Sequence, residues 1–447
     1  MGRITLGQAA AWCGGRIDPK YENVTFLGAN NDTRKLEKDQ LFVVLKGARD
    51  GHEFVPAVLE KGAAAVLCNH CDGDYPAIVV EDTRIALGKI AAQERQRIGM
   101  KVVGVTGSVG KSTTKEMIVC ALSSAYKVAK TPANHNNDIG MPMAILAIPE
   151  DTEVAVLEMG MNHFREIAYL SQIAKPDLGV IINIGTMHIE HLGSKEGILQ
   201  AKMEILEGMD GKGKLLLNGD DALLWKVQEN RAVAHCYFGW KNERCHLVAK
   251  DAVQEDGVIR FAVNGTQMTL PLEGEHYVPD AMAAVAVGLE LGVTMEQIAA
   301  RLSQFETMAG RQEIEERNGY TSIRDYYNAG PESLAAALAV LGGKNGRKIA
   351  VLGDMLELGD CAPAEHDKVG RTAAEKADMV FAYGPNSKYM LEGCHVGGMQ
   401  SAFAFTDRDQ LATALKQAVK PGDVILFKGS RGMRMELILE KFLEEKK

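Results

Sequence analysis

Residues 102–115 read Val102-Val103-Gly104-Val105-Thr106-Gly107-Ser108-Val109-Gly110-Lys111-Ser112-Thr113-Thr114-Lys115. An apolar run leads through a glycine loop into a segment of helical composition, which is the order of a phosphate-binding loop. Position 105 is Val, so the strict pattern with glycine five residues before the Gly-Lys pair is not met, and the loop depends on Gly107 and Gly110. Because every part occurs in the right order, we interpret this segment as a nucleotide site and not as an ordinary glycine turn.

Each residue type in this loop has a physical reason to bind phosphate. Glycines let backbone N–H groups curl around phosphate oxygens, and the following helix adds N-terminal donors and its dipole. Lys111 is expected to reach the β- and γ-phosphates, and Ser112 to ligate magnesium. The loop alone does not define a reaction, because GTPases, motors, kinases and ligases all carry one. The nucleotide-binding candidates are Gly107, Ser108, Val109, Gly110, Lys111, Ser112 and Thr113.

Length and composition bound the class of protein. At 447 residues, and with about 150 residues per domain, the chain is expected to form roughly three domains. No segment reaches the roughly 20 apolar residues of a membrane span, and the N-terminus has no signal-peptide pattern. We therefore expect a cytoplasmic protein without a membrane span. The net charge of -9 argues against a protein that coats nucleic acid and favours small anionic ligands.

The eight cysteines are scattered along the chain, which suits reduced thiols better than a disulfide framework. Only Cys68-Asn69-His70-Cys71 has the spacing of metal ligands, and no second pair completes a set of four. We therefore expect thiols beside a turn here and not a zinc site.

The alternation of apolar runs with helical segments predicts an α/β protein of three domains. Residues 1–98 read as a small α/β domain. A composition shift opens a central P-loop domain at 99–308, whose βαβ units imply a mostly parallel sheet. Within it, residues 247–272 change to period-two strands with a hairpin signal at Asn264-Gly265. Residues 309–447 have the pattern of a doubly wound, Rossmann-like domain.

Two strands near the phosphate loop are followed by side chains that can bind a metal ion. Glu158 ends one apolar strand, where a carboxylate can meet magnesium beside the phosphates. His188 follows the next strand and can ligate a metal through one neutral nitrogen. Ligands bind at the carboxyl ends of strands in an open α/β sheet, so both are expected to face the crevice of Lys111. Lys202 lies on the following helix, where position alone predicts a solvated surface charge.

Segments along nearly the whole chain resemble the Mur ligase family. They occur in the family's order, from the phosphate loop to the C-terminal region. The matching segments are 104–115, Asn134-His-Asn-Asn-Asp-Ile-Gly-Met-Pro142, Glu158-Met-Gly160, His188 to Ser194, Ala201-Lys202, Asp325-Tyr-Tyr-Asn-Ala-Gly-Pro331, Leu352-Gly-Asp-Met-Leu-Glu-Leu-Gly359 and Lys428-Gly-Ser-Arg431.

The resemblance implies an ATP-dependent amide ligase of peptidoglycan synthesis. Residues 32–34 and 42–51, with the segments at 325–331 and 352–359, are most similar to members that join D-alanyl-D-alanine to UDP-muramoyl tripeptide. In such an enzyme the N-terminal domain binds the UDP-sugar peptide, the central domain binds ATP, and the C-terminal domain closes over ATP and helps bind the dipeptide. The tripeptide carboxylate attacks the γ-phosphoryl group, and the amine of the dipeptide then attacks the resulting acyl phosphate.

The resemblance also assigns roles to single residues. Lys202 would carry a carbamate, which turns a cation into an anion able to hold a second magnesium with His188. The catalytic residues implied are Lys111, Glu158, His188 and Lys202, and the metal ligands are Ser112, Glu158, His188 and Lys202. Further nucleotide contacts are assigned to Asn137, Asn328 and Arg311. Substrate contacts are assigned to Asp32, Thr33, Arg34, Lys428 and Arg431, and Lys428 could also meet phosphate after closure.

This chain departs from the family pattern at two places, and other functions stay open. The usual Gly-x-His-Asn-x-x-Asn is Gly274-Glu-His276-Tyr277-Val-Pro-Asp280, which alters the expected contacts to the nucleotide base, and the second asparagine of Asn-Ala-Asn is Gly330. One alternative is another ligase of this family, adding the third peptide residue or adding glutamate to folate. Another is a P-loop regulatory ATPase or GTPase, which would hydrolyse nucleotide without an amine acceptor. We expect a monomer.

Overall fold

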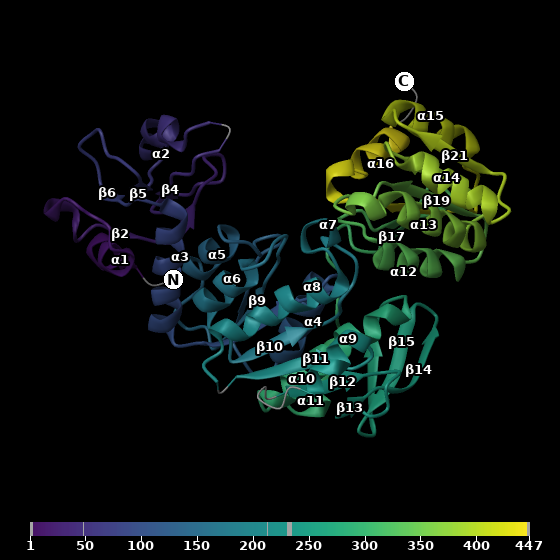
Figure 1. The fold of residues 1–447 in the computed structure, drawn as a ribbon, viewed down its shortest axis with the longest axis horizontal. Coiled ribbons are helices and arrows are strands. Elements are labelled where there is room, and N and C mark those ends of the chain that lie inside the picture. Colours follow the sequence, from purple (N-terminus) through teal and green to yellow (C-terminus); the bar gives the residue numbers. More distant parts are fainter. Residues whose placement is uncertain (1–2, 48, 212, 230–234, 445–447) are drawn as a thin grey trace.

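The computed structural model describes residues 3–47, 49–211, 213–229 and 235–444. Figure 1 shows three bodies, which we call the N-terminal, central and C-terminal units; the central one lies between and below the other two in this view. They run from β1 (Ile4–Thr5) to α3 (Thr83–Ile98), from β7 (Lys101–Thr106) to α11 (Met295–Leu302), and from β17 (Glu313–Arg317) to α16 (Glu436–Leu443). Among the residues described, no helix is long and apolar enough to cross a membrane.

The N-terminal unit contains a small parallel sheet covered by α3. Asp82 starts this helix by accepting hydrogen bonds from the N–H groups of Arg84 and Ile85, and Gly99 ends it at φ 73. Helix α3 also packs against helices of the central unit, so the two units share one hydrophobic core. The sheet is β3 (Ala29–Asn30), β4 (Leu41–Val43), β5 (Ala65–Cys68) and β6 (Ala77–Val79), with the antiparallel pair β1 and β2 (Thr25–Phe26) and helices α1 (Leu6–Cys13) and α2 (Val55–Glu60).

Among the described residues, the central sheet has seven parallel strands in the order β13-β12-β11-β10-β7-β9-β8. Val105 of β7 pairs with Glu158 of β9, and Thr106 pairs with Ile181 of β10. The carboxyl ends of these strands therefore meet at one edge, where the following loops can form a site. The other strands are β8 (Val128–Lys130), β9 (Val154–Glu158), β10 (Leu178–Ile181), β11 (Lys214–Asn218), β12 (His235–Gly239) and β13 (Leu247–Val248).

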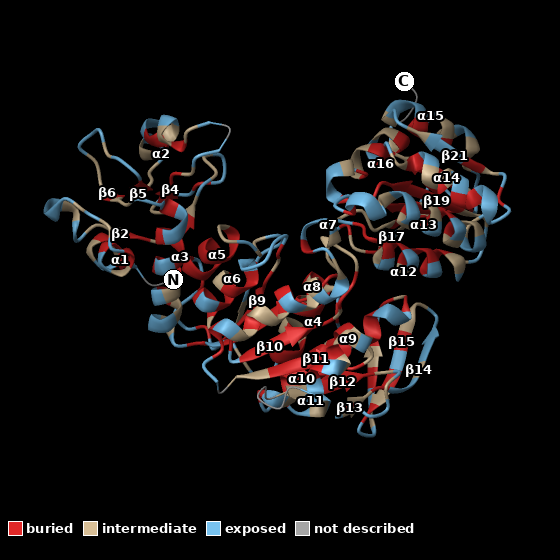
Figure 2. Cartoon of the chain, viewed as in Figure 1, coloured by how far each residue is buried: buried red, intermediate tan, exposed pale blue. Residues whose placement is uncertain are grey.

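Helices flank this sheet, and buried residues concentrate in its strands (Figure 2). The chain alternates between the two element types because apolar runs form the buried strands and amphipathic segments cover them. The helices are α4 (Lys111–Leu122), α5 (Gly140–Leu146), α6 (Glu166–Ala174), α7 (Ile189–Leu192), α8 (Lys195–Met203), α9 (Ala222–Trp225), α10 (Val278–Glu290) and α11.

The predicted antiparallel insert is present in the central unit. It consists of β14 (Lys250–Glu255), β15 (Val258–Val263) and β16 (Thr266–Leu270). The hairpin between β15 and β16 turns at Asn264 and Gly265, which both have positive φ, at 49 and 83. Two left-handed residues are what a two-residue hairpin turn requires, so the Asn-Gly pair formed the turn for the reason expected.

The C-terminal unit is a doubly wound sheet in the order β17-β18-β22-β19-β20-β21, antiparallel at β17 and otherwise parallel. Separate clusters of buried residues fill its two faces. The predicted α/β class, with a central parallel sheet and a C-terminal Rossmann-like sheet, is confirmed. Its elements include β18 (Tyr320–Arg324), β19 (Lys348–Gly353), β20 (Met379–Tyr383), β21 (Ala402–Phe405), β22 (Val424–Lys428), α12 (Pro331–Gly342), α13 (Ala362–Lys376), α14 (Ser387–Val396) and α15 (Arg408–Ala418).

Polar contacts join the C-terminal unit to the central unit. Glu332, at the start of α12, accepts hydrogen bonds from the N–H and hydroxyl groups of Thr186 at 3.0 and 3.1 Å. Lys344 forms an ion pair with Glu273. The loop before α13 lies against α7, where Gly359 approaches Glu190. This contact differs from the continuous apolar core between the other two units, so we expect the C-terminal unit to move more easily.

Candidate active site

The phosphate loop joins β7 to α4 and is held from below by Asn183. The Asn183 side chain accepts hydrogen bonds from the N–H groups of Ser108 and Val109 at 3.0 and 2.9 Å, and donates to the Val109 carbonyl at 2.8 Å. Gly110 precedes the helix at φ 87, and a Cβ there would lie 2.8 Å from Asp280 Oδ1. Glycine is therefore required at this position by both conformation and space. Asn183 was not among the predicted site residues.

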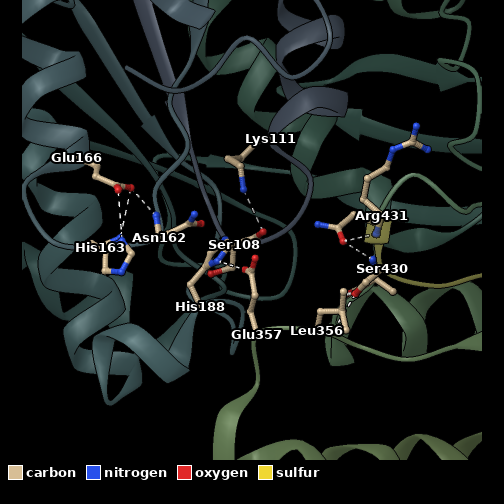
Figure 3. Close-up of polar contacts among 12 residues, drawn as sticks. Ser108, Lys111, Asn162, His163, Glu166, His188, Leu356, Glu357, Ser430 and Arg431 are labelled. Atoms are coloured by element: carbon tan, nitrogen blue, oxygen red, sulfur yellow. Dashed lines mark hydrogen bonds and ion pairs between the residues drawn. The ribbon is translucent and has the colours of Figure 1, made fainter. Parts of the chain in front are cut away.

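Lys111 turns back onto the loop that it was predicted to serve. Its Nζ donates to the carbonyls of Gly107 and Ser108 at 2.8 and 3.2 Å (Figure 3). Burial lowers the pKa of Lys111, while Glu158 opposes this shift and Arg311 adds to it. A phosphate group would give this half-buried ammonium the counter-charge that the two carbonyls supply only in part.

Glu158 and Ser112 lie together at the carboxyl edge of the sheet. The Ser112 hydroxyl donates to Glu158 Oε2 at 2.8 Å, and Asn136 Nδ2 donates to Oε1 at 2.8 Å. The buried Lys115 ammonium lies 3.8 Å from Oε2. Oxygen ligands beside a phosphate loop suit magnesium, so this pair fits the predicted metal role. Asn136 and Lys115 were not among the predicted site residues, although both stand inside motifs that the sequence displays.

Asn137 has a different position from its neighbour Asn136. Its side-chain oxygen accepts hydrogen bonds from the N–H groups of Ile139 and Gly140 at 3.3 and 2.8 Å, which anchors the start of α5. Asn137 also lines the large cavity described below. Its predicted contact with nucleotide remains a prediction, while its structural role at the helix start is clear.

His188 follows β10 and lies near the phosphate loop. It precedes α7 at φ 66, a left-handed conformation that is uncommon for residues other than glycine. Its Nδ1 lies 2.6 Å from Oε2 of Glu357, a residue of the C-terminal unit (Figure 3). The two atoms are close enough for an ion pair, although the angle is not that of a hydrogen bond. Contact with His188 lowers the pKa of Glu357.

Lys202 is buried on α8, so the solvated surface position expected from the sequence alone is wrong. Only 1% of the residue is exposed. Burial lowers its pKa well below the usual lysine value, and the nearby positive charge of Lys111 lowers it further. The turn of α8 that carries Lys202 faces the protein interior and not solvent. The spacing of apolar residues along so short a helix does not show which side of the helix is buried. Lys202 does not line the large cavity.

The C-terminal unit brings several predicted residues to the same region. Lys428 is buried, donates to Asp325 Oδ2 at 2.6 Å and donates to the Asn328 carbonyl at 3.2 Å. Arg431 is exposed, and its N–H donates to Asn328 Oδ1 at 3.4 Å. Arg311 reaches across from the link between units and donates to the Ser112 hydroxyl at 2.9 Å. A cluster of cations therefore stands opposite the phosphate loop.

One cavity of about 1030 Å³ contains most of these groups. It is lined by residues of all three units, which places the phosphate loop, the candidate metal ligands and the C-terminal cations around a common space. The predicted residues that line it are Ser108, Val109, Gly110, Lys111, Ser112, Thr113, Asn137, Glu158, His188, Arg311, Asn328, Lys428 and Arg431.

Three predicted substrate residues lie elsewhere. Asp32, Thr33 and Arg34 are in the N-terminal unit and do not line this cavity. Arg34 forms an ion pair with Asp32 at 2.8 Å, and this contact lowers the pKa of Asp32 to about 2. The Thr33 carbonyl accepts a hydrogen bond from Lys61 at 2.9 Å. The structure therefore places this segment apart from the reaction centre.

The departures from the family pattern are at the cavity or against its loops. Asp280 is buried, accepts a hydrogen bond from Thr114 at 2.7 Å, and burial raises its pKa to about 7. Tyr277 is also buried and lines the cavity, and the exposed His276 beside it lines the cavity as well. At Gly330 a Cβ would lie 2.8 Å from Cγ of Met187.

The two cysteines of the segment with metal-like spacing direct their thiols to different backbone carbonyls. Cys68 is buried with its thiol directed to the Ile78 carbonyl, and Cys71 directs its thiol to Gly73. In the part of the chain that the structure describes, no group of three or more His, Cys, Asp or Glu side chains could hold a metal ion. A metal at the phosphate loop would therefore need ligands such as the Ser112 hydroxyl, a modified lysine or the substrate phosphates.

Comparison with known proteins gives a consistent picture. Residues 105–288 match the Mur ligase middle domain, and residues 310–431 match the glutamate ligase domain of Mur ligases. The UDP-N-acetylmuramoyl-tripeptide–D-alanyl-D-alanine ligase of Bacillus subtilis is 40% identical, over 96% of this chain and 95% of that protein. The Escherichia coli protein of the same name is 34% identical over 99% and 98%.

Solved structures agree over the full length. A crystal structure of MurF from Acinetobacter baumannii superposes with a TM-score of 0.91 at 32% identity, covering 100% of both chains. MurF of Thermotoga maritima in complex with ADP gives a TM-score of 0.82 at 31% identity, covering 93% of this chain and 97% of that one. Sequence and structure thus agree along nearly the whole chain, and we conclude that it belongs to the Mur ligase family.

Proposed function

We propose that this protein is an ATP-dependent ligase that joins D-alanyl-D-alanine to UDP-N-acetylmuramoyl tripeptide, with release of ADP and phosphate. The observation that carries this proposal is the similarity along nearly the whole chain to ligases of this name, such as that of Bacillus subtilis at 40% identity. The cavity supports it, because the phosphate loop faces cations of the C-terminal unit across a space large enough for two substrates. The cytoplasm, where ATP and UDP-linked precursors are available, is the proposed location, and the enzyme is proposed to act as a monomer.

We assign the reaction to an acyl-phosphate route. A carboxylate is a poor acyl donor, so transfer of the γ-phosphoryl group to the tripeptide carboxylate would activate it for attack by the dipeptide amine. Lys111 and the loop N–H groups would bind the phosphates, and Arg311 and Lys428 would neutralise charge on the transferring group. Bringing both substrates into one closed space would supply orientation.

Magnesium fits the donor set at the phosphate loop. The oxygens of Ser112 and Glu158 already lie 2.8 Å apart beside the loop, and His188 lines the same cavity. Bound magnesium would neutralise the phosphate oxygens during transfer. We propose Lys202 as a carbamate that joins His188 at a second ion, because a buried amine next to Lys111 is held toward its neutral, nucleophilic form.

The three units would divide the work. We propose that residues 1–98 bind the UDP-sugar peptide, with Asp32, Thr33 and Arg34 contacting parts remote from the reacting carboxylate. Residues 99–308 would bind ATP through the phosphate loop and Asn137, and Asn328 of the C-terminal unit would add a further contact to the nucleotide. Residues 309–447 would close over ATP and help to bind the dipeptide, with Lys428 and Arg431 at the substrates.

The direct test is an assay of ADP release with UDP-muramoyl tripeptide, in the presence and absence of D-alanyl-D-alanine. ADP and a UDP-muramoyl pentapeptide identified by mass should form only when both substrates are present. Turnover with a different amino acid, and not with the dipeptide, would instead identify another ligase of the family. Hydrolysis of ATP that does not respond to either substrate would identify a regulatory ATPase and reject the proposal.

A second test addresses the acyl phosphate. UDP-tripeptide labelled with heavy oxygen in its terminal carboxylate should transfer one labelled oxygen to the released phosphate. Phosphate without label would exclude this route, even if the same amide product formed.

A further inference from the structure

His188 and Glu357 face each other from two different units, and both have strained backbones. His188 has φ 66 in the central unit, and Glu357 has φ 64 in the C-terminal unit. A residue other than glycine in this region costs free energy that the surroundings must hold in place. Strained residues whose side chains meet at 2.6 Å across an interface therefore indicate a contact under functional constraint.

The backbone of His188 is fixed on both sides. Before it, the Gly185 N–H donates to the Ser108 hydroxyl at 2.9 Å, which ties this loop to the phosphate loop. After it, the N–H groups of His191 and Leu192 donate to the His188 carbonyl at 3.1 and 3.3 Å. The orientation of the imidazole about its side-chain bonds is therefore the main freedom left to this residue.

Glu357 is delivered by an equally anchored segment. The Leu356 N–H donates to the Ser430 hydroxyl at 3.0 Å (Figure 3). The Met355 N–H donates to His366 Nε2 at 3.0 Å. Leu358, the next residue, is buried. The carboxylate thus moves with the C-terminal unit as a whole and reaches His188 only when that unit is docked.

The contact uses one nitrogen of the imidazole and leaves the other. Glu357 Oε2 lies beside Nδ1, so Nε2 is the ring nitrogen left to face a metal ion. In metal-binding histidines, the ring nitrogen that does not bind the metal is commonly in contact with a carboxylate, which fixes both the tautomer and the orientation of the ring.

We propose that Glu357 is a positioning residue that orients His188 toward a divalent ion, so that docking of the C-terminal unit completes the metal site. The proposal rests on the proposed function only in naming magnesium as that ion. A simple docking role explains the contact less well, because Glu273 with Lys344 and Glu332 with Thr186 already join the units. A half-exposed ion pair would also add little to docking by itself.

The test measures divalent-ion binding and not only activity. Mn²⁺ is titrated by electron paramagnetic resonance into the full-length enzyme saturated with a non-hydrolysable ATP analogue. We expect Glu357→Ala to weaken Mn²⁺ binding about 10- to 100-fold and to lower kcat similarly. Affinity for the analogue without metal, and KM for ATP, should stay within about twofold of wild type. Glu357→Gln keeps an acceptor at the same place and should recover part of the loss.

Two further variants separate positioning from docking. Glu273→Ala removes another ion pair between the same units without touching the site, and it should leave Mn²⁺ binding unchanged. The double variant His188→Ala/Glu357→Ala should bind Mn²⁺ no more weakly than His188→Ala alone, because Glu357 acts through His188. An equal loss in Glu273→Ala, an additive double variant, or normal Mn²⁺ binding by Glu357→Ala would each overturn the proposal.

These outcomes are independent of the proposed reaction. If the wild-type enzyme shows this pattern of Mn²⁺ binding but does not join the two substrates, the proposed function fails and the positioning role of Glu357 stands. If the wild-type enzyme joins the two substrates while Glu357→Ala binds Mn²⁺ normally, the proposed function stands and the positioning role of Glu357 fails.

Discussion

Asp280 is a residue whose burial should make the stability of the chain depend on pH. Burial raises the pKa of its carboxyl to about 7, whereas an aspartate in an unfolded chain titrates near ~3.9. As pH rises from about 4 to about 7, the unfolded state loses this proton first, so the free energy of unfolding falls. Asp280→Asn removes that loss. We expect the variant to gain stability over wild type between these pH values, up to a bound on the order of 4 kcal/mol.

Denaturant unfolding of both proteins near the two ends of this range measures the difference. A stability difference that does not change with pH would contradict the pKa raised by burial. Asp151→Asn is the matched control, because Asp151 is an exposed carboxylate paired with Lys127 at 2.8 Å and its removal should change stability little.

Lys202 provides a second prediction at the scale of one residue. A carbamate can form only on a neutral amine, and burial beside Lys111 favours that form. Arginine remains charged at all accessible pH values and cannot take this modification. We expect Lys202→Arg to lower kcat on the order of 10²- to 10³-fold. Labelled bicarbonate should give a carbamate signal by carbon NMR in wild type and none in the variant.

Stability must be checked in the same experiment, because arginine is larger than lysine in a buried position. Lys202→Met fills similar space without charge and serves as the second variant. A carbamate signal that persists in Lys202→Met would place the modification on another residue, and full activity in either variant would exclude the assigned role.

At the scale of the phosphate loop, Asn183 should act as a clamp. Its side chain makes hydrogen bonds to two N–H groups and one carbonyl of Ser108 and Val109, and so holds the loop in shape before nucleotide binds. Each such bond contributes roughly 0.5–1.5 kcal/mol. We expect Asn183→Ala to weaken binding of a non-hydrolysable ATP analogue at least about 10-fold, as measured by calorimetry.

The control for this prediction is Asn242→Ala, which removes an amide side chain that donates to the Gly219 carbonyl, away from the cavity. It should bind the analogue as wild type does. Unchanged binding by Asn183→Ala would mean that these hydrogen bonds do not prepare the loop for nucleotide, and tighter binding would mean that they hold the loop in a form that nucleotide must first change.

Helices and strands with a clear pattern of apolar residues could be predicted from the sequence, and those without such a pattern could not. β7, β9 and β10 were predictable because each is a buried apolar run that ends where its polar side chains begin. β17 was missed because Glu313-Ile314-Glu315-Glu316-Arg317 is an exposed edge strand whose residues favour a helix or a loop. Its strand form comes from pairing with β18, which is a tertiary effect.

For the whole molecule, the motifs predicted the part of the site on the central sheet better than the part that depends on contacts between units and helices. Side chains on strand ends of one sheet, such as Glu158 and His188, were placed correctly relative to the phosphate loop, because sheet geometry decides where strand ends lie. No comparable geometric rule predicts which residues meet between units. Glu357 on His188 and the burial of Lys202 depend on how units and helices pack, and spacing along the chain does not contain that information.

The last prediction concerns docking of the C-terminal unit. Gly330 stands where the family pattern has asparagine, and its φ of -140 is accessible to any residue. Space is the limit instead, because an added Cβ would lie 2.8 Å from Met187 Cγ of the central unit. Gly330→Ala should therefore disfavour the docked arrangement. Methionine is flexible and can yield, so we expect a cost near the low end of overpacking, about 1 kcal/mol or roughly a fivefold shift toward the undocked form.

Small-angle scattering measures this shift as an increased radius of gyration in the presence of a non-hydrolysable ATP analogue. Met187→Ala opens the space that the new methyl group needs, so Gly330→Ala/Met187→Ala should dock as Met187→Ala alone does, and the two effects should not add. If Gly330→Ala is as compact as wild type, the packing of Met187 against Gly330 does not limit docking. If the double variant stays as expanded as Gly330→Ala, then the lost glycine acts through a different neighbour, and the contact between these two residues is not what couples the units.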